Sequence, residues 1–264
     1  MVFYNQKFRI LSLIKSLMPK LQNFQTDNLR LSKRLDGEVK AKFFEAEVKE
    51  WKKKFPNKVA IKKQHMLNQK EKNIIEAIMK YQEQHELKES NKQPSTQLVK
   101  IYDIIQMNSE SAFVMELGEN NLLFYLKNNK PSLKKILQIN QLSQSIRFIH
   151  QDLKSMHRDI KPENFIYIGD QFKLIDFGTV RYNTNIDKTI QIGTTLYQAP
   201  EMVNGQSNHT EAIDIWSLGC VFYEFFGPEP LFYGKIQTAV KNDIQSIITN
   251  QKDLKEKINS NKGG

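Results

Sequence analysis

The apolar positions change their period between the two halves of the chain. In the first half, segments rich in valine and isoleucine lie between polar turns, at residues 59–61, 97–107 and 111–117. Runs of this length and composition predict β-strands. From Leu122 to His150 the apolar residues recur every three to four positions, which predicts two helices broken at Lys130-Pro131-Ser132. The pattern therefore predicts an α+β protein, β-rich first and mainly helical afterwards.

A short hairpin is predicted after the second of these helices. Two β-type runs, residues 165–168 and 172–175, flank Gly169-Asp170, a dipeptide suited to a tight turn. A hairpin returns the ends of its two strands to the same place. Residues 159–164, which precede it, should therefore lie close to Asp176, which follows it.

The polar residues at the open end of this hairpin form a recognisable chemical set. Asp159 and Asp176 supply carboxylates, Asn164 supplies an amide oxygen, and Lys161 supplies an ammonium group. Mg²⁺ prefers oxygen ligands, and phosphates need a cation. The set therefore predicts a site for a hard cation and a phosphate.

Two motifs in this region carry a family resemblance. Asp176-Phe177-Gly178 begins twelve residues after the end of the run His157-Arg158-Asp159-Ile160-Lys161-Pro162-Glu163-Asn164. Together they resemble the catalytic and metal-binding loops of eukaryotic protein kinases, in the serine/threonine form. The resemblance spans about residues 31–250 and implies a bilobal kinase fold, with a β-rich small lobe (about 31–117) and a mainly helical large lobe (about 118–250).

The resemblance implies a role for each polar residue, with ATP and Mg²⁺ as the cofactors. Asp159 would orient the substrate hydroxyl and accept its proton, and Lys161 would stabilise charge on the transferred phosphoryl group. Thr194 would hydrogen-bond to both of these residues. Asn164 and Asp176 would hold Mg²⁺.

Further residues are implied to bind the nucleotide. The run Val59-Ala60-Ile61-Lys62 matches a strand of the family that ends in a lysine, so Lys62 would bridge the α- and β-phosphates. Met115 would be the gatekeeper beside the adenine, and the backbone of Glu116 and Leu117 would bind the adenine edge. Ile166 belongs to the same expected set.

The glutamate that pairs with Lys62 has two candidates on the next predicted helix. Glu76 has the more usual distance from the lysine in the family. At 100° per residue, however, it points about 140° away from the centre of the apolar face, whereas Glu71 lies on that face. The face is formed by Ile74, Ile75 and Ile78. Residues 83–95, which follow, are polar and predict a loop.

The chain departs from the family at its phosphate-binding loop. The family places three glycines there, so that backbone N–H groups can approach the phosphates closely. Here Asp36, Glu38 and Ala41 occupy those positions, and only Gly37 remains. This departure favours an alternative function, a catalytically weak or inactive pseudokinase that acts as a binding scaffold.

A second departure concerns the end of the kinase domain. The family continues for several helices beyond the position of residue 250, whereas residues 251–264 are a polar tail. We therefore expect truncated C-terminal helices and a partner that covers the short C-terminal lobe.

Composition and charge change this picture little. The 264 residues carry a net charge of +10, but the lysines are scattered and no nucleic-acid motif accompanies them. A solvated basic surface is the preferred interpretation, with no sequence-specific nucleic-acid binding. The single cysteine, Cys220, excludes an internal disulfide, and no apolar run is long enough to span a membrane.

Residues 1–30 form a basic amphipathic leader. A helical extension or a weakly ordered leader is the preferred interpretation, and an organelle presequence is the alternative. We expect a cytoplasmic or nuclear protein.

Several residues bear on the protein substrate and on regulation. By the resemblance, the β-branched Thr179 favours threonine acceptors, and Glu163 and Glu224 favour basic residues upstream of the acceptor. Thr184 and Thr189 are candidate phosphorylation sites, where a phosphate would pair with Arg158. The sequence also has a faint resemblance to the monopolar-spindle dual-specificity kinases.

Overall fold

The structure, a computed structural model, divides the chain into two compact units, Met1–Lys72 with Val99–Gly118, and Asn73–Leu98 with Glu119–Gly264. It describes residues 29–35, 41–48, 56–65, 67, 69–88, 97–106, 110–128, 133–183, 195–206, 208–227, 229–232 and 237–249. Several sequence predictions lie outside these residues: most of the leader, the polar tail, Asp36, Gly37, Glu38, Thr184, Thr189 and Thr194.

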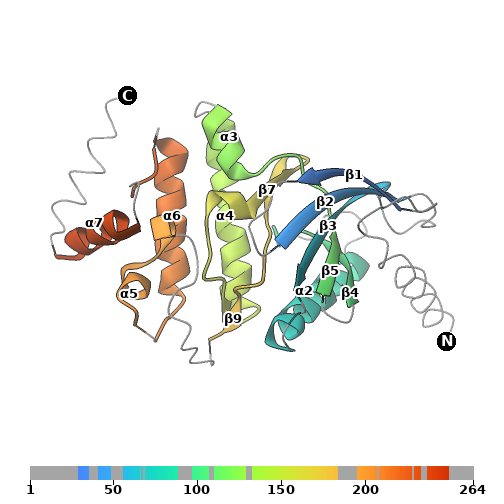
Figure 1. Cartoon of the computed structure of the whole chain (residues 1–264), viewed down its shortest axis with the longest axis horizontal. Coiled ribbons are helices and arrows are strands. Elements are labelled where there is room, and N and C mark those ends of the chain that lie inside the picture. Colours follow the sequence, from blue (N-terminus) through green and yellow to red (C-terminus); the bar gives the residue numbers. More distant parts are fainter. Residues whose placement is uncertain are drawn as a thin grey trace. The chain divides into compact units, whose positions relative to one another are not determined.

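The first unit contains one antiparallel sheet (Figure 1). Its strands are β1 (Leu29–Leu35), β2 (Ala41–Val48), β3 (Lys58–His65), β4 (Ile101–Gln106) and β5 (Glu110–Met115), in the order β1-β2-β3-β5-β4. The prediction that a strand ends at Lys62 was wrong, because Lys63 and Gln64 continue the pairing of β3 with β5. Lys62 therefore lies within a strand that is paired on both sides.

Helix α2 (Gln69–Lys88) begins in the first unit and continues into the second. Its buried face contains Ile74, Ile75 and Ile78, as the apolar period predicts. The loop predicted from Glu83 begins too early, since the helix runs through Lys88. Residues 83–88 contain neither glycine nor proline and are mostly good helix formers, so nothing local ends the helix there.

The second unit is mainly helical. Helices α3 (Leu122–Asn128) and α4 (Leu133–Gln151) end and begin on either side of Pro131, which confirms the predicted break. α5 (Pro200–Val203), α6 (Ala212–Phe226) and α7 (Gln237–Thr249) follow, and α6 packs against α4. The buried side chains of α4 and α6 form much of the core: Leu142, Ile146, Ile149, Ile213, Val221 and Phe225. None of the helices in the described part of the chain has the length and apolar character needed to cross a membrane.

Short strands and 3₁₀ turns position the loops of the second unit. β6 (Ser155–Met156) pairs with β9 (Arg181–Tyr182), and two 3₁₀ turns, η2 (Pro162–Asn164) and η3 (Thr195–Tyr197), complete the set. β7 (Phe165–Ile168) pairs with β8 (Gln171–Leu174) around the turn Gly169-Asp170, where Gly169 has a φ of +61°. This confirms the predicted hairpin. Its open end is closed by the Ile175 N–H, which donates to the Asn164 carbonyl at 2.8 Å.

Candidate active site

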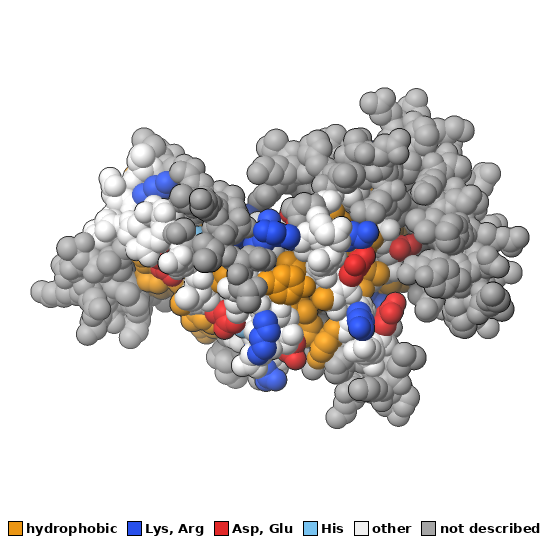
Figure 2. Space-filling model, turned by 90° about the horizontal axis from the view of Figure 1, so that it is seen from below, with side chains coloured by type: hydrophobic (Ala, Val, Ile, Leu, Met, Phe, Trp, Pro, Cys, Tyr) orange, Lys and Arg blue, Asp and Glu red, His pale blue; other side chains and the backbone are white. Residues whose placement is uncertain are grey.

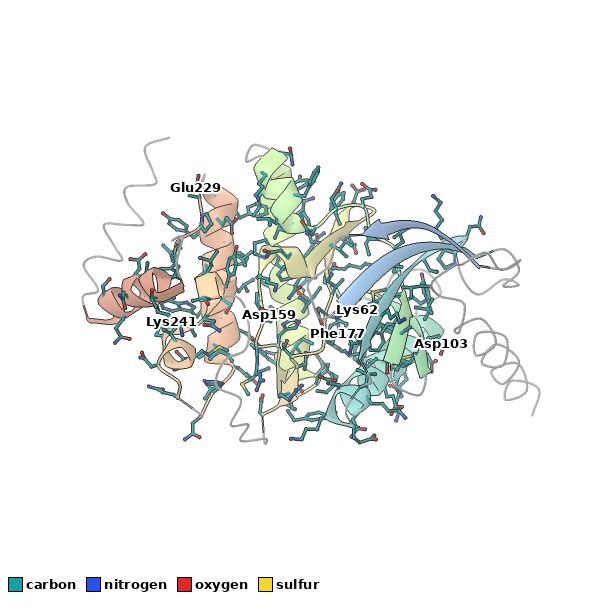
Figure 3. All side chains as sticks on the ribbon, in the orientation of Figure 1. Lys62, Asp103, Asp159, Phe177, Glu229 and Lys241 are labelled. Atoms are coloured by element: carbon teal, nitrogen blue, oxygen red, sulfur yellow. The ribbon has the colours of Figure 1, made fainter. Side chains whose placement is uncertain are left out.

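The centre of the candidate site in the second unit is the carboxylate of Asp159 (labelled in Figure 3). The Lys161 ammonium lies 3.1 Å from its Oδ2 atom, and both side chains are nearly buried. The Asn164 amide donates from Nδ2 to the Asp159 carbonyl at 2.7 Å and to Oδ2 at 3.2 Å. The structure thus brings together the three polar residues predicted on the catalytic loop.

The backbone of this loop is held by Asp214 at the start of α6. Its Oδ2 atom accepts the His157 N–H at 2.7 Å, and its Oδ1 atom accepts the Arg158 N–H at 2.8 Å. His150 of α4 lies 2.8 Å from the same carboxylate, which is fully buried. Arg158 has a φ of 71°, a left-handed conformation that persists only where its surroundings enforce it. Asp214 therefore fixes the loop that carries Asp159.

The residues of the predicted metal site fit Mg²⁺. Because the Nδ2 atom of Asn164 donates to Asp159, its Oδ1 atom is the one that can bind a cation. Asp176 supplies a carboxylate from the end of the hairpin and has a φ of 63°. Within the described residues, no group of three or more His, Cys, Asp or Glu side chains is arranged to hold a metal ion. One carboxylate and one amide suit Mg²⁺, which usually keeps several waters and binds substrate phosphates as well.

The first unit presents Lys62 and Met115 on one face of its sheet. Lys62 lies opposite Phe113, and Ala60 lies opposite Met115, so these four side chains share a face. Lys62 is 4% exposed and Met115 6% exposed. Lys62 also takes part in a polar or electrostatic interaction within the protein, and its phosphate-binding role stays a prediction.

The segment after Met115 has its own hydrogen bonds. The Glu116 N–H donates to the Lys100 carbonyl at 2.9 Å, and the Lys100 N–H donates to Glu116 Oε2 at 3.3 Å. Leu117 follows directly and is partly buried. Ile166, predicted to contact the nucleotide, lies on β7 in the second unit and forms an isolated bridge with Asn121. The adenine-binding role of these residues stays a prediction.

The two glutamates proposed for Lys62 differ in exposure. Glu71 is partly buried, whereas Glu76 is exposed. Both make electrostatic or polar interactions in the structure. The exposure agrees with the helical-face argument for Glu71, and the partner of Lys62 stays a prediction.

A second polar cluster anchors η3 to α6. The Tyr197 hydroxyl donates to Glu224 Oε2 at 2.8 Å, and the Ser217 hydroxyl donates to the Tyr197 carbonyl at 2.6 Å. Burial raises the pKa of the Glu224 carboxyl above its ordinary range, and the hydrogen bond from Tyr197 opposes this shift. Burial and the neighbouring Glu224 also raise the pKa of the Tyr197 hydroxyl. Glu224 is therefore a site at which folding favours the protonated form.

This raised pKa predicts a pH-dependent effect of Glu224→Gln on stability. The pKa of Glu224 is higher in the folded state than in the unfolded state. The wild type therefore loses stability as pH rises from the unfolded-state pKa through the folded-state pKa. The glutamine does not titrate and still accepts the Tyr197 hydrogen bond. We expect the variant to be more stable relative to wild type at pH 7 than at pH 4.

Urea unfolding of both proteins at the two pH values measures this difference. Tyr197→Phe is the matched control, because it removes the donor to the carboxylate and should destabilise the protein at pH 7. An equal stability difference between Glu224→Gln and wild type at both pH values would contradict the prediction.

Sequence reasoning missed His150, Tyr197 and Ser217. His150 follows Ile146 by one helical turn and interrupts an apolar face, which was the signal that a buried polar partner exists. Tyr197 and Ser217 gave no such signal, since neither interrupts a regular pattern.

Comparison with known proteins agrees with this geometry. The family model that describes the protein kinase domain matches residues 45–262. The chain belongs to the protein kinase domain family. The match includes the sheet strand with Lys62, the loop with Asp159 and the hairpin that ends at Asp176.

Individual relatives are kinases by name, and one of the three described next is named a serine/threonine-protein kinase. The chain is 34% identical over 166 residues to "Cyclin-dependent kinase-like 1" of Caenorhabditis elegans, which covers 60% of this chain and 44% of that protein. It is 32% identical over 189 residues to the human "MAPK/MAK/MRK overlapping kinase", which covers 66% of this chain and 44% of that protein. It is 32% identical over 165 residues to the mouse "Serine/threonine-protein kinase ICK", which covers 59% of this chain and 26% of that protein. The chain thus spans less than half the length of these relatives. The finer resemblance to monopolar-spindle kinases stays a prediction.

Proposed function

We propose that the chain is an ATP-dependent protein kinase that transfers the γ-phosphoryl group to serine and threonine hydroxyls of protein substrates. The observation that carries this proposal is the Asp159 carboxylate, paired with Lys161 and held by Asn164 on a backbone that Asp214 fixes. Phosphoryl transfer depends mainly on positioning and electrostatic stabilisation, and a cluster fixed in this way supplies both.

In the proposed reaction the substrate hydroxyl oxygen forms a bond to the γ-phosphorus, and the bond between this phosphorus and the β–γ bridging oxygen breaks. ADP leaves with the electron pair, and Asp159 accepts the hydroxyl proton. The Lys161 ammonium, close to Asp159, stabilises the charge on the transferred group. Lys62 holds the α- and β-phosphates. Asn164 and Asp176 would hold Mg²⁺, and the ion would supply positive charge against the charge that develops on the phosphate oxygens.

A preference for basic substrates is part of the proposal. Glu163 Oε2 is buried and has no hydrogen-bond partner among the described residues. Glu163 lies close enough to Glu224 for its charge to oppose the ionisation of the Glu224 carboxyl. Two neighbouring acidic groups, one of them with an unused acceptor, favour an arginine or lysine side chain of the substrate.

The alternative of an inactive scaffold is less well supported. It rests on Asp36, Glu38 and Ala41 in the phosphate-binding loop, of which only Ala41 lies in the described residues. Every residue expected to touch the metal on the second unit is present, and the catalytic loop has a fully hydrogen-bonded support in Asp214. The family members named above are also kinases by name.

Proposals about other partners rest on surface features. Figure 2 shows the Lys and Arg side chains of the described residues interspersed with Asp and Glu on the face it presents, which supports a solvated basic surface. A partner over the C-terminal lobe has one observation in its favour, the exposure of Ile215 and Phe226 on α6 (56% and 55%). A cytoplasmic or nuclear location is proposed on the single cysteine alone.

Magnesium-dependent binding of ATP tests the site. We expect Mg²⁺ and ATP together to raise the melting temperature of the wild type, since ligand at 100 times its Kd stabilises by about 2.7 kcal/mol. Asp176→Asn should lose the magnesium-dependent part of this shift. Asp170→Asn, a change of an exposed aspartate in the hairpin turn, is the matched control and should keep it. A wild type that melts cooperatively without any shift would contradict ATP binding.

A further inference from the structure

The carbonyl of His157 connects the catalytic loop to the metal-binding loop. The Thr179 hydroxyl, one residue after Asp176-Phe177-Gly178, donates to this carbonyl at 2.8 Å. The N–H of the same His157 donates to Asp214. The backbone of one buried residue is therefore bonded to α6 on one side and to the metal-binding loop on the other.

Other contacts of the metal-binding loop converge on the same place. The rings of Phe177 and His157 pack edge to face, with centroids 6.4 Å apart. The Arg181 guanidinium donates from Nη1 to the carbonyls of Gly178 at 3.2 Å and Val180 at 2.7 Å, so it fixes the backbone on both sides of Thr179. These contacts hold the backbone of the metal-binding loop around Thr179, next to the catalytic loop.

The metal-binding residue itself needs this support. Asp176 has a φ of 63°, a left-handed conformation that is uncommon outside glycine and asparagine-like residues. Its Oδ1 atom accepts the Gly178 N–H at 3.2 Å, so the direction of the carboxylate depends on the backbone that Thr179 anchors. A hydrogen bond between the side chain of one loop and the backbone of the other fixes such a conformation.

We propose that the Thr179 hydroxyl is a positioning group for Asp176: by binding the His157 carbonyl, it holds the metal-binding carboxylate at the correct place relative to Asp159. The inference rests on the proposed kinase function and assigns Thr179 a role in Mg²⁺ binding. This role belongs to its hydroxyl and is distinct from the acceptor preference expected from its β-branched shape.

Two substitutions distinguish the effect of the Thr179 hydroxyl from the effect of its β-branched shape. Thr179→Val keeps the β-branch and removes the donor, whereas Thr179→Ser keeps the donor and removes the β-branch. We expect Thr179→Val to need about three- to ten-fold more free Mg²⁺ for half-maximal phosphoryl transfer, the effect of losing one partly buried hydrogen bond. Its rate at saturating Mg²⁺ and its threonine-to-serine preference should stay within about two-fold of wild type. Thr179→Ser should keep the wild-type Mg²⁺ dependence.

Thr210→Val is the matched control, because Thr210 is an exposed threonine just before α6. It should leave the Mg²⁺ dependence unchanged. A Thr179→Val protein that loses rate equally at all Mg²⁺ concentrations would overturn the inference, since a purely structural role predicts that result.

Hydrogen exchange tests the role of Thr179 without requiring phosphoryl transfer. Titration with Mg²⁺ in the presence of ADP should slow amide exchange in the segment 175–182. In Thr179→Val this slowing should need a higher Mg²⁺ concentration than in wild type or Thr179→Ser. Identical titrations would overturn the inference. A wild type that shows the titration but transfers no phosphate would instead refute the proposed kinase activity and leave the positioning role supported.

Discussion

Replacing Asp159 by asparagine lowers the rate of phosphoryl transfer by about 10²- to 10⁴-fold, the usual contribution of a general base together with the orientation that it provides. The amide has nearly the same size as the carboxylate, so the loop keeps its shape. It cannot accept the substrate proton, and it no longer forms an ion pair with Lys161 at 3.1 Å. The loss should therefore appear in kcat, with the KM for ATP changed by no more than a few-fold.

Steady-state kinetics of the purified variant measure this loss. Asp152→Asn is the matched control, because Asp152 is an exposed aspartate just before the catalytic loop. It should retain activity within about two-fold, as surface substitutions usually do. An Asp159→Asn protein with more than a tenth of the wild-type kcat would contradict the role assigned to this carboxylate.

Asp214→Asn should strongly destabilise the second unit. The two carboxylate oxygens accept hydrogen bonds from two backbone N–H groups, and His150 lies against one of them. An amide offers only one oxygen, so one buried donor must face an NH₂ group. We expect a loss of about 2–4 kcal/mol, which lowers the melting temperature by roughly 5–15 °C.

The same substitution should also reduce kcat, because Arg158 is no longer held in its left-handed conformation beside Asp159. Glu211→Gln is the control: Glu211 precedes α6, is 42% exposed and lies 3.9 Å from His150. Removing the charge of Glu211 should change the free energy of unfolding by less than about 0.5 kcal/mol. Unfolding of Asp214→Asn within 1 kcal/mol of wild type would show that another contact holds the loop.

The parts of the fold that sequence predicted were those set by local rules. The break between α3 and α4 follows from Pro131, and the β7–β8 hairpin follows from Gly169-Asp170 between two apolar runs. The cluster of Asp159, Lys161 and Asn164 is also local, since a single loop and one 3₁₀ turn carry all three.

What sequence did not predict depends on distant partners. His150 meets Asp214 across 64 positions, and Tyr197 meets Glu224 across 27, so no periodicity relates them. The full length of β3 was missed for a similar reason: Lys63 and Gln64 are polar, and their pairing with β2 and β5 keeps them in the strand. The end of α2 was missed because polar composition was interpreted as a loop, although the residues are good helix formers.

Transfer of phosphate from γ-labelled ATP to a mixture of serine- and threonine-containing peptides tests the central claim most directly, with wild type and Asp159→Asn measured side by side. Our account predicts Mg²⁺-dependent label on serine and threonine hydroxyls, enriched in peptides with basic residues, and almost none with the variant. A wild type that melts cooperatively and binds Mg²⁺ and ATP, but labels peptides no faster than Asp159→Asn, would contradict kinase activity and favour a binding scaffold.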